Sequence, residues 1–165
     1  MAEITFRGTP IHSVGELPEV GSKAPDYILT GGDLSDIKPE KFAGRRVILN
    51  IFPSVDTGVC ATSVRTFNQR AGSLDNTTVV CVSNDLPFAL NRFCGAEGLS
   101  NVAVASAFRS DFGTSYGVQL ADGPLRGLLS RAVVVVDADG TVSYTEQVPE
   151  IGQEPDYDAA IAALS

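Results

Sequence analysis

An apolar run that ends at a proline, Val47–Phe52 followed by Pro53, constrains the fold of this chain more than any other feature. A run of this length that is rich in β-branched residues is typical of a strand buried on both faces of a sheet. Pro53 ends the strand because proline has no N–H to give to the ladder. A polar turn, Ser54–Thr57, leads into a helical stretch over Cys60–Ala71. The pattern therefore predicts a buried strand, a turn and a helix in immediate succession.

Cys60 falls near the first turn of this predicted helix. The first N–H groups of a helix have no partners within it, and the helix dipole is positive at that end. Both effects stabilise a thiolate. Thr57 lies three residues earlier, where its hydroxyl could bond backbone N–H groups or point at the group that the sulfur attacks. From position alone, Cys60 is equally well explained as a small buried hydrophobic residue.

Size and charge limit the classes of partner. The chain has 165 residues, of which 44% are hydrophobic and 19% charged. These values predict one globular domain spanning residues 1–165. Twelve basic and 20 acidic residues give a net charge of −8. This charge argues against nucleic acid or an anionic membrane as a partner, since both attract clustered Lys and Arg.

The N-terminal residues show no basic-then-apolar signal pattern, and no apolar run reaches the length of a membrane span. We therefore expect a cytoplasmic protein, in which cysteines are more often redox-active than structurally bridged. The cysteines are Cys60, Cys81 and Cys94, and the one histidine is His12. Without a C-x-x-C pair, neither a dithiol motif nor a zinc knuckle is supported. We expect no metal and no organic cofactor.

The remaining pattern predicts an α/β fold with a mixed sheet flanked by helices. Gly31–Asp33 is predicted to be a turn, Cys81 a core residue within a strand, and Cys94 a helical residue. A β-hairpin is expected near the N-terminus, from alternating apolar and polar residues in Glu3–Arg7 and Ile11–Gly15. Further strands are predicted over Thr77–Ser83, Asn101–Ala105, Arg131–Asp137 and Thr141–Gln147. Further helices are predicted to begin near Asp85 and to cover Phe108–Tyr116 and Asp156–Leu164.

The spacing Pro53-x-x-x-Thr57-x-x-Cys60 resembles the active-site motif of the peroxiredoxins, which are thiol peroxidases on a thioredoxin-like fold. The longer strings FPSVDTGVCATSVRTFN and RFCGAEG resemble the thiol peroxidase branch of that family, of the atypical 2-Cys type. The resemblance covers nearly the whole chain and implies a thioredoxin-like fold with an N-terminal hairpin. One position departs from it, because Gly58 stands where we expect proline.

The resemblance implies a role for each of five residues. Cys60 would attack the peroxide and become a sulfenic acid. Thr57 and Arg131, which opens the predicted strand RAVVVVD, would bind the peroxide oxygens, and Pro53 would shield the sulfur. Cys94 would resolve the sulfenic acid as an intrachain disulfide with Cys60. Read without the resemblance, Arg131 is a solvated strand end and Cys94 a packed helix residue.

The implied activity is reduction of hydrogen peroxide and of organic hydroperoxides, alkyl or lipid, with recycling by thioredoxin or a similar dithiol. A homodimer is also implied. Two other functions fit the same residues. A peroxide sensor or disulfide carrier would relay oxidation to a partner protein, and a noncatalytic interaction module would carry three inert thiols.

Overall fold

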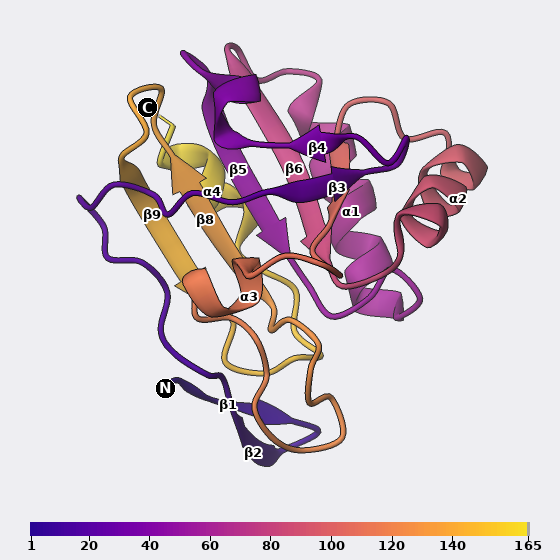
Figure 1. Ribbon diagram of the computed structural model, residues 1–165, viewed down its shortest axis with the longest axis vertical. Coiled ribbons are helices and arrows are strands. Elements are labelled where there is room, and N and C mark those ends of the chain that lie inside the picture. Colours follow the sequence, from indigo (N-terminus) through magenta and orange to yellow (C-terminus); the bar gives the residue numbers. More distant parts are fainter. Residues whose placement is uncertain (165) are drawn as a thin grey trace.

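The computed structural model describes residues 1–164, which form a seven-stranded mixed sheet flanked by helices and a separate two-stranded hairpin (Figure 1). The strands are β1 Glu3–Phe6, β2 Thr9–His12, β3 Leu29–Gly31, β4 Asp36–Ile37, β5 Arg46–Ile51, β6 Thr77–Ser83, β7 Ala103–Ser106, β8 Ala132–Val136 and β9 Val142–Gln147. The helices are α1 Gly58–Ala71, α2 Pro87–Glu97, α3 Phe112–Ser115 and α4 Tyr157–Ala162, with a 3₁₀ turn at Pro39–Phe42. The large sheet has the order β4-β3-β7-β6-β5-β8-β9.

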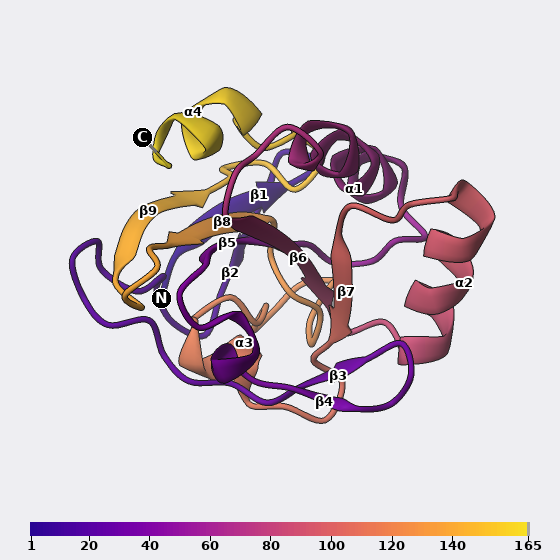
Figure 2. The same ribbon diagram turned by 90° about the horizontal axis from the view of Figure 1, so that it is seen from above.

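The central strands β5, β6 and β8 are apolar because side chains pack on both faces of the sheet (Figure 2). Ile48 points to the face covered by α1 and α4, where Val64 and Phe67 pack. Leu49 points to the opposite face, toward Phe112 of α3 and its neighbours. This two-sided burial explains the continuous apolar runs in the sequence.

Strand direction brings three loops to one edge of the sheet. β5 and β6 are parallel, so their carboxyl ends lie at the same edge. β8 is antiparallel to β5, with Ile51 opposite Ala132, so β8 begins at that edge. The segments after β5, after β6 and before β8 therefore meet, although they are far apart in sequence.

The predicted mixed sheet and N-terminal hairpin are confirmed, but the bounds of the hairpin turn and of one helix were wrong, and one strand was missed. The hairpin turn consists of Arg7 and Gly8, both with positive φ (52° and 81°), so Thr9 already lies in β2. Leu29–Gly31 forms a strand that pairs with β7, where only a turn at Gly31–Asp33 was predicted. A short strand containing glycine has little signal of its own, and its pairing with β7 is a tertiary effect.

The helix predicted over Phe108–Tyr116 is limited to Phe112–Ser115. Serine hydroxyls hold the preceding residues in a turn, because Ser106 Oγ accepts from the Phe108 N–H and Ser110 Oγ from the Phe112 N–H. None of the helices in residues 1–164 is long and apolar enough to cross a membrane.

His12 of β2 joins the hairpin to the loop before β8. Its Nδ1 lies 2.7 Å from Asp122 Oδ2 and its Nε2 lies 3.1 Å from Glu3 Oε2. The His12 N–H also donates to Asp122 Oδ1 at 2.8 Å. The hydrogen bond with Asp122, and then that with Glu3, raise the pKa of His12 above its ordinary value.

Stability should therefore fall with rising pH where His12 titrates. The raised pKa means that the His12 contribution is complete below the unfolded value of ~6.5 and is lost as the pH rises through the folded-state pKa. We expect the free energy of unfolding to decrease as the pH rises above ~6.5, and to decrease less in His12→Gln. Denaturant unfolding at a series of pH values measures this, and parallel profiles for the two proteins would refute the assignment.

Candidate active site

Cys60 is the third residue of α1 and has no solvent exposure. Its side chain packs in the core cluster that contains Phe52, Val55 and Val64. The backbone of Thr57 is extended, with φ −108° and ψ 146°, and provides the N-cap position of α1. The Thr57 hydroxyl does not cap the helix; it donates instead to the Ser54 carbonyl at 3.0 Å. The free N–H groups of the first turn thus have no side-chain cap.

Arg131 is buried, with 1% of its surface exposed, so the interpretation as a solvated strand end was wrong. It lies directly before β8, at the edge of the sheet where α1 begins. Its Nη2 donates to Cys60 Sγ at 3.2 Å and its Nε donates to the Ile151 carbonyl at 2.8 Å. Nη1 is also buried and has no hydrogen-bond partner among the described residues. The structure therefore brings Cys60 and Arg131 into contact and leaves one guanidinium nitrogen with unused N–H groups.

No carboxylate among the described residues pairs with Arg131. The salt bridges among residues 1–164 all join other residues. A buried cation without an anionic partner is costly, and here the guanidinium faces the Cys60 sulfur. The positive charge of Arg131 is thus presented directly to the sulfur.

The loop between β5 and α1 is held by Asp85, a residue whose role the sequence did not reveal. Pro53 is buried in this loop. Asp85 accepts from Ser54 Oγ at 2.7 Å, from the Val55 N–H at 2.9 Å and from Ser83 Oγ at 2.6 Å. The sequence predicted Asp85 near the cap of α2, but Leu86 occupies that position without a side-chain bond. One feature of the sequence could have indicated this role of Asp85: the residue comes just after β6, whose carboxyl end lies at the same edge of the sheet as that of β5.

Cys94 and Cys81 lie outside the Cys60–Arg131 contact, on α2 and β6. All three cysteines are free thiols. Cys81 is fully buried in β6, as predicted, and burial raises its pKa to about 12. Cys94 is half-buried on α2, and burial raises its pKa as well. The structure does not bridge Cys60 to Cys94.

Surface contacts hold α2 against α1 and its preceding loop. Arg65 donates to both carboxylate oxygens of Glu97, at 2.7 and 3.1 Å, and lies over the ring of Phe93 at 5.6 Å. Arg92 lies 3.4 Å from Asp56. These side chains are largely exposed, so each ion pair contributes little to stability.

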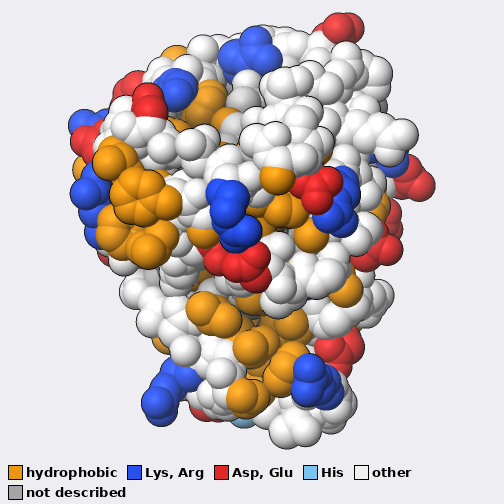
Figure 3. Space-filling model, turned by 90° about the vertical axis from the view of Figure 1, so that its right-hand side faces the viewer, with side chains coloured by type: hydrophobic (Ala, Val, Ile, Leu, Met, Phe, Trp, Pro, Cys, Tyr) orange, Lys and Arg blue, Asp and Glu red, His pale blue; other side chains and the backbone are white. Residues whose placement is uncertain are grey.

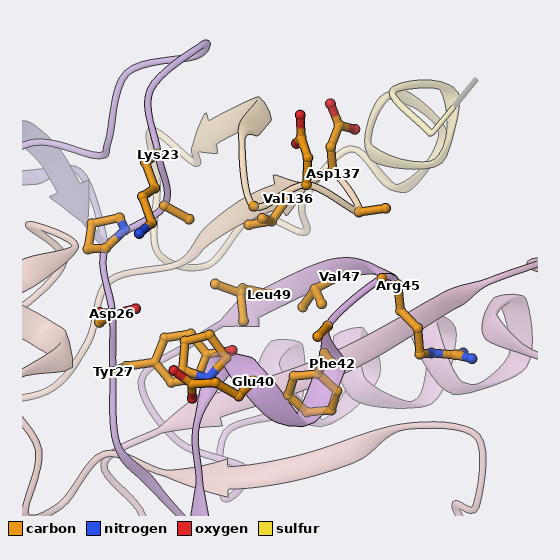
Figure 4. A pocket seen from close by; sticks show the side chains of 18 of the residues that line it. Lys23, Asp26, Tyr27, Glu40, Phe42, Arg45, Val47, Leu49, Val136 and Asp137 are labelled. Carbon is orange, nitrogen blue, oxygen red and sulfur yellow. The ribbon is translucent and has the colours of Figure 1, made fainter.

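Two cavities lie away from the Cys60–Arg131 contact. One, of about 280 Å³, has an apolar floor that includes Tyr27, Phe42, Val47 and Leu49 (Figure 4). The other, of about 600 Å³, lies between the entry segment at Ile28 and the loop at Arg109. Neither is lined by Cys60 or Arg131. No group of three or more His, Cys, Asp or Glu in residues 1–164 is placed to hold a metal ion.

The chain as a whole has relatives among known proteins. A sequence profile of the Redoxin family matches residues 19–161. A thiol peroxidase of Mycobacterium tuberculosis is 65% identical over 164 residues, which cover 99% of each chain. The chain belongs to the redoxin family, in its thiol peroxidase branch. Membership of this branch shows that the protein is an enzyme.

Two further relatives agree with this membership. A thiol peroxidase of Corynebacterium glutamicum is 56% identical over the full length of both chains. The crystal structure of a peroxiredoxin-like protein from Aquifex aeolicus matches with a TM-score of 0.90 and 36% identity, covering 98% of this chain and 95% of that one. The thioredoxin-like fold inferred from the resemblance is thus confirmed. In this thiol peroxidase Gly58 is the first residue of α1, and open space lies where a Cβ would stand.

Replacing Asp85 tests its hold on the active-site loop. Asp85→Ala leaves the Val55 N–H and two hydroxyls without their acceptor. We expect the free energy of unfolding to fall by about 1–3 kcal/mol. We also expect slower oxidation of Cys60 by peroxide, because the loop that precedes α1 is no longer fixed. Chemical unfolding and single-turnover kinetics measure the two effects; unchanged kinetics would show that Asp85 does not position the loop.

Proposed function

We propose that this enzyme reduces hydrogen peroxide and organic hydroperoxides, alkyl or lipid, with Cys60 as the nucleophile. The observation that carries the proposal is the 3.2 Å contact between two buried groups, Arg131 Nη2 and Cys60 Sγ. The guanidinium donates to the sulfur at which the reaction starts, and the thiolate is the nucleophilic form of cysteine. The relatives that bear the name thiol peroxidase support this assignment.

The reaction is a displacement at oxygen. The Cys60 thiolate attacks one oxygen of R–O–O–H, an S–O bond forms, and the O–O bond breaks. The electron pair leaves with RO⁻, which takes up a proton to give ROH, while the sulfur is oxidised to a sulfenic acid. The unused N–H groups on Arg131 Nη1 donate hydrogen bonds to the peroxide as charge moves from sulfur to the leaving oxygen. The Thr57 hydroxyl, whose proton goes to the Ser54 carbonyl, accepts the O–H of the peroxide.

The peroxide approaches from the start of α1. Asp56, Thr57 and Gly58 are exposed and immediately precede the buried Cys60. Pro53 is buried in the same loop and shields the sulfur from water. Hydrogen peroxide needs only a narrow opening, so the larger cavities elsewhere are not required.

Cys94 resolves the sulfenic acid. Its sulfur attacks Cys60 Sγ, the S–S bond forms, and the hydroxyl leaves as water with the thiol proton. The start of α1 and the turn that carries Cys94 must open for the sulfurs to meet. The ion pairs between α2 and α1 are exposed and each worth about 0–1 kcal/mol. Leu90 of α2 is buried in the core cluster that contains Cys60, and Phe93 packs against it, so the opening must also expose apolar surface.

Thioredoxin or a similar dithiol then reduces the disulfide. Figure 3 shows the side of the molecule that carries α2, where hydrophobic side chains reach the surface between charged ones. Leu86 and Phe88, at the start of α2, are 52% and 64% exposed. Such apolar side chains suit a protein partner, either the reductant or a second copy in a homodimer. We propose that residues 1–165 act as a single domain in the cytoplasm.

Replacing Arg131 tests the observation on which the proposal rests. Arg131→Met keeps an apolar side chain of similar length and removes the charge and the donors. Loss of a donor to developing charge costs on the order of 3 kcal/mol, so we expect oxidation of Cys60 to slow by about a hundredfold. Stopped-flow measurement of the reaction with peroxide checks this, with Arg131→Lys as the variant that retains the charge. A rate near that of the wild type in Arg131→Met would exclude the proposed role.

Replacing Cys94 and replacing Cys81 should affect the reaction with peroxide differently. Cys94→Ser should react once with peroxide and then stall as a sulfenic acid, with sulfinic acid forming in excess peroxide. Cys81→Ser should turn over normally and lose some stability, because it buries a hydroxyl in β6. Peptide mapping after one equivalent of peroxide should find Cys60 bridged to Cys94 within one chain. A bridge to Cys81, or one formed only between two chains, would refute the resolving role.

A further inference from the structure

The N-terminal hairpin pairs on its outer edge with the segment that follows β9. Thr5 lies opposite Pro10 in the hairpin, and Pro10 has no N–H to donate across the pair. The backbone groups of Thr5 point outward instead. Its N–H donates to the Pro149 carbonyl at 2.8 Å, and its carbonyl accepts from the Ile151 N–H at 2.9 Å. The two bonds form a parallel bridge around Glu150.

This bridge ends at the partner of Arg131. The carbonyl of Ile151, whose N–H is held by Thr5, accepts the Arg131 Nε–H at 2.8 Å. The Ile151 side chain is buried with Ile4 and Ile11 of the hairpin, so the same residue is fixed by packing as well. The Nε bond is the one contact to a carbonyl that this guanidinium makes among the described residues. The position of Ile151 therefore sets the direction in which the guanidinium points.

The carboxylate of Glu150 adds side-chain hydrogen bonds to both segments joined by this bridge. Oε1 accepts from the Gly8 N–H at 3.0 Å and from Thr5 Oγ1 at 3.1 Å, and Oε2 accepts from the Gly152 N–H at 2.7 Å. One side chain thus joins the hairpin turn, β1 and the residue after Ile151. These bonds, first those from the Gly152 and Gly8 N–H groups, lower the pKa of Glu150.

We infer that the N-terminal hairpin is a positioning element for Arg131, and that Glu150 is the positioning residue that couples the two. The inference rests on the proposed function, in which Arg131 activates Cys60. Loss of the Glu150 side-chain bonds leaves the 149–152 segment held to the hairpin only by the two Thr5 bonds and by packing of Ile151, so the Ile151 carbonyl is held less firmly beneath Arg131 Nε. The guanidinium gains freedom to turn away from the Cys60 sulfur, and small misplacements of a catalytic group cost large factors in rate.

A double-mutant cycle tests the coupling. The variants are Glu150→Gln, Arg131→Met and the two combined, and the readout is the single-turnover rate of Cys60 oxidation by hydrogen peroxide. Glutamine keeps the shape of Glu150 but offers one acceptor oxygen where three donors converge. Asp139→Asn is the matched control, because Asp139 also accepts a backbone N–H in a turn, from Thr141 at 3.0 Å, at the far end of β8.

We expect Glu150→Gln to slow the reaction on the order of tenfold in the wild-type background and to have no further effect beside Arg131→Met. Asp139→Asn should leave the rate unchanged. The inference would be overturned if Glu150→Gln left the rate unchanged, whether or not it lowered the Tm. It would also be overturned if Glu150→Gln slowed the reaction equally in the wild-type and Arg131→Met backgrounds. If Arg131→Met itself reacts at the wild-type rate, the proposed role of Arg131 fails, and this inference fails with it.

Discussion

A permanent positive charge is buried in this protein, and no carboxylate in the described part of the chain pairs with it. The guanidinium of Arg131 is bound by the Ile151 carbonyl and by the sulfur of Cys60. Burial of an unpaired charge opposes folding, and the sulfur of Cys60 is the group that faces it. In the function proposed above, the same contact activates the sulfur as a nucleophile. Stability and reactivity are thus linked at a single contact.

The strand order of the sheet makes this contact possible. Parallel β5 and β6 deliver the Cys60 loop and Asp85 to one edge, and antiparallel β8 begins with Arg131 at that edge. The hairpin then closes the edge from outside by pairing with residues 149–151. Each reacting group is set by an element that is itself fixed by the core, which is how a small site without a large cavity keeps its geometry.

The sequence was most informative where burial is two-sided and least informative where partners are distant. The apolar runs of β5, β6 and β8 could be predicted because both of their faces are covered. The motif around Cys60 indicated the family, and the structure places Cys60 beside Arg131. The strand at Leu29–Gly31 was missed because its pairing with β7 comes from the tertiary fold. Asp85 and Glu150 were missed for a related reason, since several of their partners lie more than 25 residues away in the chain.

Site-resolved oxidation tests the central claim most directly. The protein is mixed with less than one equivalent of hydrogen peroxide in the presence of a reagent that traps sulfenic acids, the remaining thiols are blocked, and each cysteine is identified by mass spectrometry. The account predicts that Cys60 is the first cysteine to be oxidised and is trapped as the sulfenic acid, while Cys81 stays a thiol. First oxidation at Cys94 or Cys81, with Cys60 left as a thiol, would contradict it.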